Sequence, residues 1–161
     1  MWEYEYAAET TASPEAIWRI WADVETWGEW NPDIEKIELD GPFAVGSVIA
    51  MTPVGQEVVR LRLASVKENE QFVDEAEIGG ATFRTIHRLD DIGENRVRVT
   101  YRMEITGHSA DELGPQLGPV ITADFPETVA ALISRAESEG MRRGSLSAAS
   151  PTDEFGRARR S

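Results

Sequence analysis

The chain has 161 residues, with 29 acidic and 16 basic side chains, no cysteine, two histidines, and five tryptophans that all lie within the first thirty positions. This length suits a single domain that buries enough surface to fold without a disulfide or a structural metal. Zero cysteine excludes thiol catalysis and cysteine-ligated zinc, and two histidines argue against a histidine-rich metal site, so we expect neither a metal nor a cofactor. The net charge of -13 disfavours binding to nucleic acid or to anionic membrane surfaces.

The charge is unevenly distributed along the chain. Residues 140–161 contain five arginines and two acids, so this tail carries +3 and residues 1–139 carry -16. The tail is rich in Ser, Gly and Arg and offers little to bury, so we expect a folded domain over 1–139 and a disordered basic tail over 140–161. No apolar run is long enough for membrane insertion, and the first residues lack the pattern of a signal peptide. We therefore expect a cytoplasmic protein, either a monomer or a homodimer.

The first thirty residues predict one strand and two short helices. Residues 2–9 alternate apolar and acidic side chains, which is the period of a strand with one buried face. Ser13 and Pro14 suit the N-cap and first position of a helix over about 14–22. A second short helix opens at Asp23, and the Asn31-Pro32 pair ends it.

The rest of the domain predicts a strand meander and then a long helix. Turn signals such as Gly79-Gly80 recur roughly every 12 to 14 residues between residues 34 and 106, which favours six antiparallel strands. Residues 109–139 return to helical spacing, and Pro126 predicts a kink between Thr122 and Pro126. The whole order predicts an α+β domain with a seven-stranded antiparallel sheet covered by the C-terminal helix.

Strand periodicity indicates which side chains face the covered side of the sheet. In residues 81–90 the more apolar phase contains Phe83, Thr85 and His87, and in residues 96–106 it contains Tyr101 and Met103. His87 and Tyr101 would then lie on adjacent strands of one face, which makes them the best polar candidates for a site. A hydrogen-bonded structural role for His87 and a packing role for Tyr101 remain the alternatives.

Residues 57–66 allow two strand phases. Leu61 and Leu63 favour one phase, whereas Val66 favours the other, in which Arg60 and Arg62 would face inward. A bulge would change the phase partway along the strand. In the alternative, both arginines belong to a solvent-exposed face.

Several segments, taken in order, resemble the START-like helix-grip superfamily (SRPBCC), in its polyketide cyclase/dehydrase branch. The resemblance covers residues 1–139 and implies a seven-stranded sheet that grips a C-terminal helix around an apolar cavity. Members bind or transform polyketides, lipids and sterols, and some act as co-chaperones, so the fold alone does not choose a function. The matching segments are Ser13-Pro14-Glu15-Ala16-Ile17-Trp18, residues 21–32, Leu39-Asp40-Gly41-Pro42-Phe43-Ala44-Val45-Gly46-Ser47, His87-Arg88, residues 97–102 and Thr106-Gly107.

The resemblance also implies a set of cavity-lining residues. Trp27 matches the tryptophan of the family's Asp-x-x-x-Trp segment and would form a cavity wall together with Trp30, although both suit a plain core equally well. The full set of expected ligand-binding residues is Trp27, Trp30, Phe83, Thr85, His87, Tyr101, Met103, Leu117, Ile121, Phe125 and Arg62.

Three functions follow from this reading. The first is a protein that binds a polyketide-, lipid- or sterol-like hydrophobic small molecule in an internal cavity. The second is a cyclase/dehydratase without metal or redox cofactor, in which His87 or Tyr101 transfers a proton during aldol cyclisation and Arg62 polarises a carbonyl. The third is a protein-interaction module of the co-chaperone type.

Overall fold

The computed structural model describes residues 1–149, of which residues 141–149 are described as backbone only. The elements in chain order are β1 (Trp2–Thr10), α1 (Pro14–Ala22), the 3-10 helix η1 (Val24–Glu29), β2 (Ile34–Asp40), β3 (Val48–Pro53), β4 (Val59–Lys67), β5 (Gln71–Ile78), β6 (Ala81–Gly93), β7 (Arg96–Thr106), α2 (Ala110–Thr122) and α3 (Phe125–Ala149).

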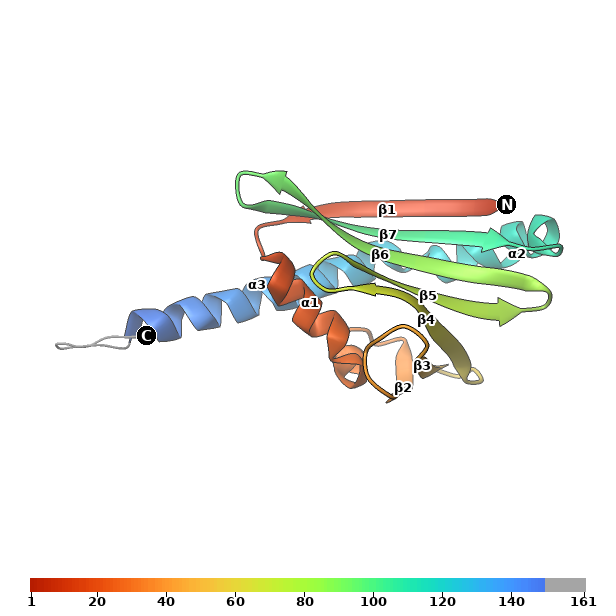
Figure 1. Cartoon of the computed structure of the whole chain (residues 1–161), viewed down its shortest axis with the longest axis horizontal. Helices are drawn as coiled ribbons and strands as arrows, with labels where there is room; N and C mark the ends of the chain where they lie inside the picture. The colour runs from red at the N-terminus through yellow and green to blue at the C-terminus, as the bar shows by residue number, and fades with distance from the viewer. Residues whose placement is uncertain (150–161) are drawn as a thin grey trace.

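The seven strands form one antiparallel sheet in the order β1-β7-β6-β5-β4-β3-β2 (Figure 1). From β2 to β6, each strand pairs with the strand that follows it in the chain. The first strand, β1, pairs with the last strand, β7. Helices α2 and α3 follow one another against β1 and β7, while α1 packs on α3. The predicted α+β fold, with one strand, two short helices, six further strands and a closing helix, is confirmed.

The helix boundaries follow local chemistry. The side-chain oxygen of Ser13 accepts a hydrogen bond from the backbone N–H of Ala16 at 3.1 Å, and Pro14 begins α1, as predicted. The closing helix is interrupted at residues 123–124, inside the interval that Pro126 predicted. Proline has no N–H to donate to the preceding turn, so α2 ends and α3 starts again at Phe125.

Helix α3 continues to Ala149, past the boundary that we expected near residue 140 (Figure 1). The helical part of this segment contains Met, Arg, Leu and Ala, which favour helix, so the helix propagates once the packed turns before it have formed. The rest of the predicted disordered tail, residues 150–161, lies outside the described residues. Over residues 1–149 no helix combines the length and the hydropathy needed to span a bilayer.

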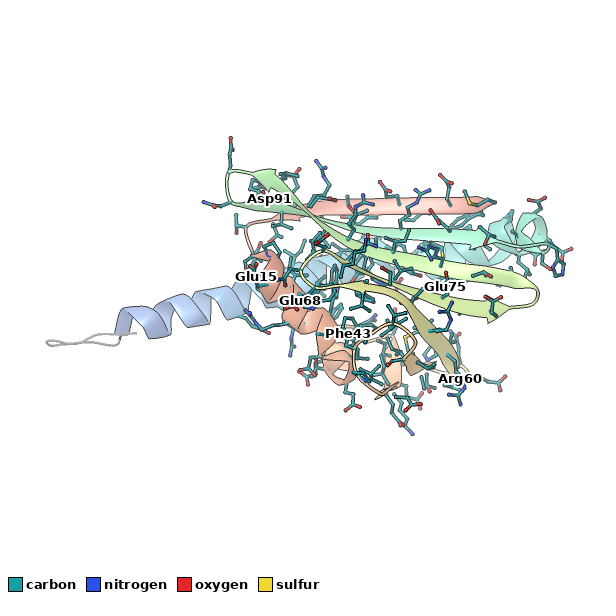
Figure 2. The ribbon with its side chains drawn as sticks, in the orientation of Figure 1. Glu15, Phe43, Arg60, Glu68, Glu75 and Asp91 are labelled. Atoms are coloured by element: carbon teal, nitrogen blue, oxygen red, sulfur yellow. The ribbon has the colours of Figure 1, made fainter. Side chains whose placement is uncertain are left out.

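The sheet has an inner face, turned toward the three helices, and an outer face that carries charged side chains. Ion pairs cross the outer face from strand to strand: Glu75 bridges Arg62 and Arg84 at 2.6 Å each, and Arg102 pairs with Glu104 at 2.9 Å. Figure 2 labels Glu75 on β5 within this row. Partly exposed pairs of this kind contribute little individually, so the stability of the fold rests mainly on the inner face.

Candidate functional site

The inner face of β6 and β7 carries the side chains that the strand periodicity nominated. Phe83, His87, Tyr101 and Met103 are buried there, and Thr85 is partly exposed. His87 lies directly opposite Tyr101 in the β6–β7 register. The predicted facing of all five residues is therefore confirmed, and it places both polar candidates side by side.

His87 and Tyr101 belong to an aromatic cluster, which we define as Trp21, Phe72, His87, Tyr101 and Phe125. The imidazole of His87 stacks on Phe72 with ring centroids 3.9 Å apart and an interplanar angle of 5°. The indole N–H of Trp21 donates to the Tyr101 hydroxyl at 3.1 Å, and Phe125 meets the Tyr101 ring at 5.6 Å. The rings of the cluster, contributed by α1, β5, β6, β7 and α3, pack on one another.

The electrostatics of the cluster work against proton transfer by either polar candidate. Burial lowers the pKa of His87 to about 3, although its Nδ1 lies 3.2 Å from the carbonyl oxygen of Phe72 and that contact acts in the opposite direction. The imidazole is thus neutral near pH 7, with Nδ1–H as the donor to this carbonyl. Burial raises the pKa of Tyr101 well above its ordinary value, and the charges of Asp74 and Asp124 raise it further. Neither group exchanges a proton readily near neutral pH.

The two tryptophans of η1 occupy different environments. Trp27 is buried, and the centroid of its ring lies 5.9 Å from that of Phe72. Its indole N–H donates a hydrogen bond to the backbone oxygen of Trp21 at 3.1 Å. Trp30, 6.5 Å from Trp27, is only partly buried, and its Nε1 is occluded without a hydrogen-bond partner. Phe43 reaches Trp18 and Phe72 from the loop between β2 and β3 (Figure 2). Trp27 therefore extends the aromatic wall, while Trp30 lies at its margin.

The residues of helix α2 that face the sheet are not the apolar ones that the helical spacing predicted. Its buried positions include Gly114 and Gly118, and a Cβ atom at either would lie within 2.6 Å of the Trp2 indole or its Cβ. Because only glycine permits this close approach, the larger residues are turned away from Trp2: Leu117 is partly buried and Ile121 is 37% exposed. The expectation that Ile121 is part of the interior is therefore wrong for this structure.

The family described as "Polyketide cyclase / dehydrase and lipid transport" matches residues 1–142. The chain belongs to this family. A search of curated proteins found no match.

Solved structures with the same fold extend this result. Norcoclaurine synthase from Thalictrum flavum, in complex with dopamine and hydroxybenzaldehyde, is 18% identical with a TM-score of 0.67, covering 82% of this chain and 84% of that one. A START superfamily protein from Mycobacterium smegmatis is 18% identical with a TM-score of 0.65, covering 84% and 97%. The di-domain ARO/CYC protein StfQ from the steffimycin biosynthetic pathway is 12% identical with a TM-score of 0.70, covering 86% of this chain and 51% of its own. At these identities the likeness shows the fold, which is the START-like helix-grip fold.

Within this family member, the β4 arginines lie on the outer face. Leu61 and Leu63 point inward, and the pairing of β4 with β5 shifts between Leu63 and Ser65, so that Val66 also falls opposite an inward residue. Because the bulge changes the strand phase between Leu63 and Ser65, the first part of β4 follows the phase of Leu61 and Leu63 and the last part follows the phase of Val66. Arg62 pairs with Glu75 on the outer face, and the exposed Arg60 lies near the start of β4 (Figure 2). The prediction that Arg62 lines the interior is therefore wrong.

One inward polar residue was missed by the sequence reading. Asp74 lies on β5, opposite Leu63 on β4 and Thr85 on β6, and is only 4% exposed. Burial, with a smaller contribution from the charge of Glu75, raises the pKa of Asp74 to about 7. The sequence did contain a sign of this placement. Asp74 shares the strand phase of Phe72, whereas the other acids of β5 fall in the opposite phase.

Two hollows formed by the described residues lie on the surface, away from the aromatic cluster. One, of about 300 Å³, is lined by Arg19, Ile20, Asp23, Thr26, Arg135 and Glu139. The other, of about 510 Å³, lies between the segment after β1 and the β6–β7 turn. Neither contains any of the predicted ligand-binding residues. Across residues 1–149, no three His, Cys, Asp or Glu side chains are grouped as metal ligands.

Proposed function

We propose that the protein binds a hydrophobic small molecule on the inner face of the sheet, between β5–β7 and α2. The observation that carries this proposal is the partial exposure of Thr85 in the middle of an otherwise buried apolar face. Its neighbour across β7 is Met103, and Leu117 on α2 is partly exposed as well. The helices thus leave part of this face uncovered. Its apolar and aromatic side chains, with a few polar groups among them, are the lining expected of a small-molecule site.

Binding is better supported than turnover. The cyclase alternative assigned proton transfer to His87 or Tyr101 and carbonyl polarisation to Arg62. The lowered pKa of His87 and the raised pKa of Tyr101 leave both groups neutral near pH 7, and Arg62 lies on the opposite face of the sheet. The relatives in this family supply the ligand class, and the aromatic cluster supplies the apolar surface that such a ligand needs.

A protein-interaction module is the second candidate. The observation that favours it is the packing of the aromatic cluster together with the position of these two hollows on the surface. In that case the acidic body, with -16 over residues 1–139, would attract a basic partner. This candidate predicts that no apolar probe binds the inner face.

Titration with N-phenyl-1-naphthylamine, a neutral apolar fluorophore, tests the proposal. We expect saturable binding at one probe per chain, with energy transfer from the tryptophans of the aromatic wall to the probe. The absence of saturable binding would sink the proposal and leave the interaction module as the better candidate.

Two variants of one strand locate the binding. Thr85→Phe places a bulky ring on the inner face, whereas Thr82→Phe places the same ring on the outer face of β6, where Thr82 now donates to Glu77 at 2.8 Å. We expect Thr85→Phe to weaken the binding of the probe at least about tenfold, because the added ring occupies the uncovered surface. Thr82→Phe should leave binding unchanged. Equal losses in the two variants would show that the probe does not use the inner face.

A further inference from the structure

Asp74 is an acid placed among apolar side chains on the inner face. It shares its strand phase with Phe72 and Ala76, both of which are buried, and its cross-strand neighbours are Leu63 and Thr85. Of these neighbours, only Thr85 has a polar side chain. The hydroxyl of Thr85 makes a single contact, at 3.8 Å, with the sulfur of Met103, which is a weak acceptor.

The carboxyl group of Asp74 has no partner within the described part of the chain. No hydrogen bond or ion pair involves its side-chain oxygens, and the causes of its shifted pKa are burial and the neighbouring Glu75 alone. The one fully occluded side-chain polar atom without a partner in that part of the chain is Nε1 of Trp30. The side-chain oxygens of Asp74 are therefore not fully occluded, although the residue is only 4% exposed. A largely buried acid without a partner is costly to the fold.

The charge around this carboxyl group has one sign. All the arginines of β4, β6 and β7 fall in the outward phase, where Arg62, Arg84 and Arg102 pair with outer-face glutamates. The nearby imidazole of His87 is neutral. A second, partly buried acid, Asp124 at the break between α2 and α3, acts on the same Tyr101 hydroxyl as Asp74; burial, together with the hydrogen bond that its protonated carboxyl donates to Asp33, raises its pKa. Among the described residues, the inward phase of β4 to β7 thus carries hydrogen-bond acceptors and the acid Asp74, and no lysine or arginine.

We propose that Asp74, with Thr85 beside it, binds the ammonium group of an apolar amine, so that the inner face selects amine-bearing ligands over carboxylates of the same shape. This inference rests on the proposed function, since it assigns the polar end of the ligand that the inner face holds. An ammonium group donates a charge-assisted hydrogen bond to a carboxylate and restores the solvation that burial removed. A fatty-acid-like carboxylate would meet the like charge of Asp74 with no compensating base beside it.

Three probes with one naphthalene body test the selection at pH 8: 1-ethylnaphthalene, 2-(1-naphthyl)ethylamine and 1-naphthaleneacetic acid. Dissociation constants come from calorimetry or from quenching of tryptophan fluorescence. In the wild-type protein we expect the amine to bind at least about tenfold more tightly than the acid, with the neutral probe between them. Asp74→Asn keeps the side-chain shape and removes the charge, and it should reduce the amine-to-acid ratio to less than about threefold while leaving the neutral probe's affinity unchanged.

A control separates this effect from the overall acidity of the protein. Glu77→Gln removes one negative charge from the outer face of the same strand, and it should keep the full preference for the amine. The order of affinities of the three probes is measured on the wild-type protein alone. The test therefore remains decisive even if Asp74→Asn folds poorly. If the neutral probe does not bind at all, the proposed function fails. If the neutral probe binds but the amine is not preferred, or the preference survives in Asp74→Asn, only the role of Asp74 is overturned.

Discussion

Replacing Asp74 with asparagine should stabilise the protein much more at alkaline pH than at acidic pH. The folded-state pKa of Asp74, about 7, lies above the ordinary value of 3.8, so between these values the folded protein holds a proton that the unfolded chain releases. The free energy of unfolding contributed by this group is therefore full below about pH 4, declines as the pH rises to about 7, and stays low above that. Asparagine remains neutral throughout and removes the decline.

The size of the effect follows from the shift. A difference of about 3 pKa units, at about 1.36 kcal/mol per unit, corresponds to a cost of about 4 kcal/mol once the group is ionised in the folded protein. At pH 5 the unfolded wild-type chain has already released this proton, so the variant should gain about 1.6 kcal/mol, which corresponds to the roughly 1.2 pH units above 3.8 at about 1.36 kcal/mol per unit. At pH 8.5 the variant should gain up to about 4 kcal/mol, which for a domain of this size raises the melting temperature by roughly 10 °C.

Thermal unfolding followed by circular dichroism at pH 5 and pH 8.5 measures the difference between variant and wild type. In this difference the contributions of the other titrating groups to stability cancel, including that of Asp124, whose pKa is also raised. Glu77→Gln, on the outer face of the same strand, is the matched control and should show no gain at pH 8.5. An equal change in melting temperature at both pH values, or destabilisation of Asp74→Asn at pH 8.5, would refute the reasoning from burial.

Two further predictions concern the packing around the inner face. Tyr101→Phe removes the oxygen that accepts the indole N–H of Trp21 and leaves that donor buried and unpaired, so urea denaturation should show a loss of about 1–3 kcal/mol; an unchanged midpoint would mean that the hydrogen bond contributes nothing. Gly118→Ala brings a Cβ to 2.6 Å from the Trp2 ring and should destabilise by about 1–3 kcal/mol, whereas Gly140→Ala, which meets nothing within 4 Å, should be neutral or slightly stabilising through helix propensity. Equal effects of the two alanines in thermal unfolding would rule out close packing of α2 on Trp2.

Much of the fold and part of the candidate site could be predicted from local sequence patterns. The two-residue period of β6 and β7 placed His87 and Tyr101 on one face, because neighbouring antiparallel strands keep a common inward phase along their length. The cap at Ser13 and the break before Pro126 followed from hydrogen-bonding groups that those residues supply or lack. The resemblance of ordered segments to the START-like helix-grip superfamily agreed with these patterns, and the family match over residues 1–142 supports it.

The tertiary structure decided the questions in which two segments must meet. The bulge in the pairing of β4 with β5 lets both Leu63 and Val66 face inward, and the inward phase of Leu61 and Leu63 leaves Arg62 on the outer face. Ile121 faces away from the core because α2 approaches Trp2 through Gly118, a contact between segments more than one hundred residues apart. The isolation of Asp74 likewise depends on which side chains surround it from β4 and β6. Periodicity indicates the direction of a side chain, but burial, charge and partners belong to the assembled sheet, and these are the properties that turn an inward acid into a candidate binding group.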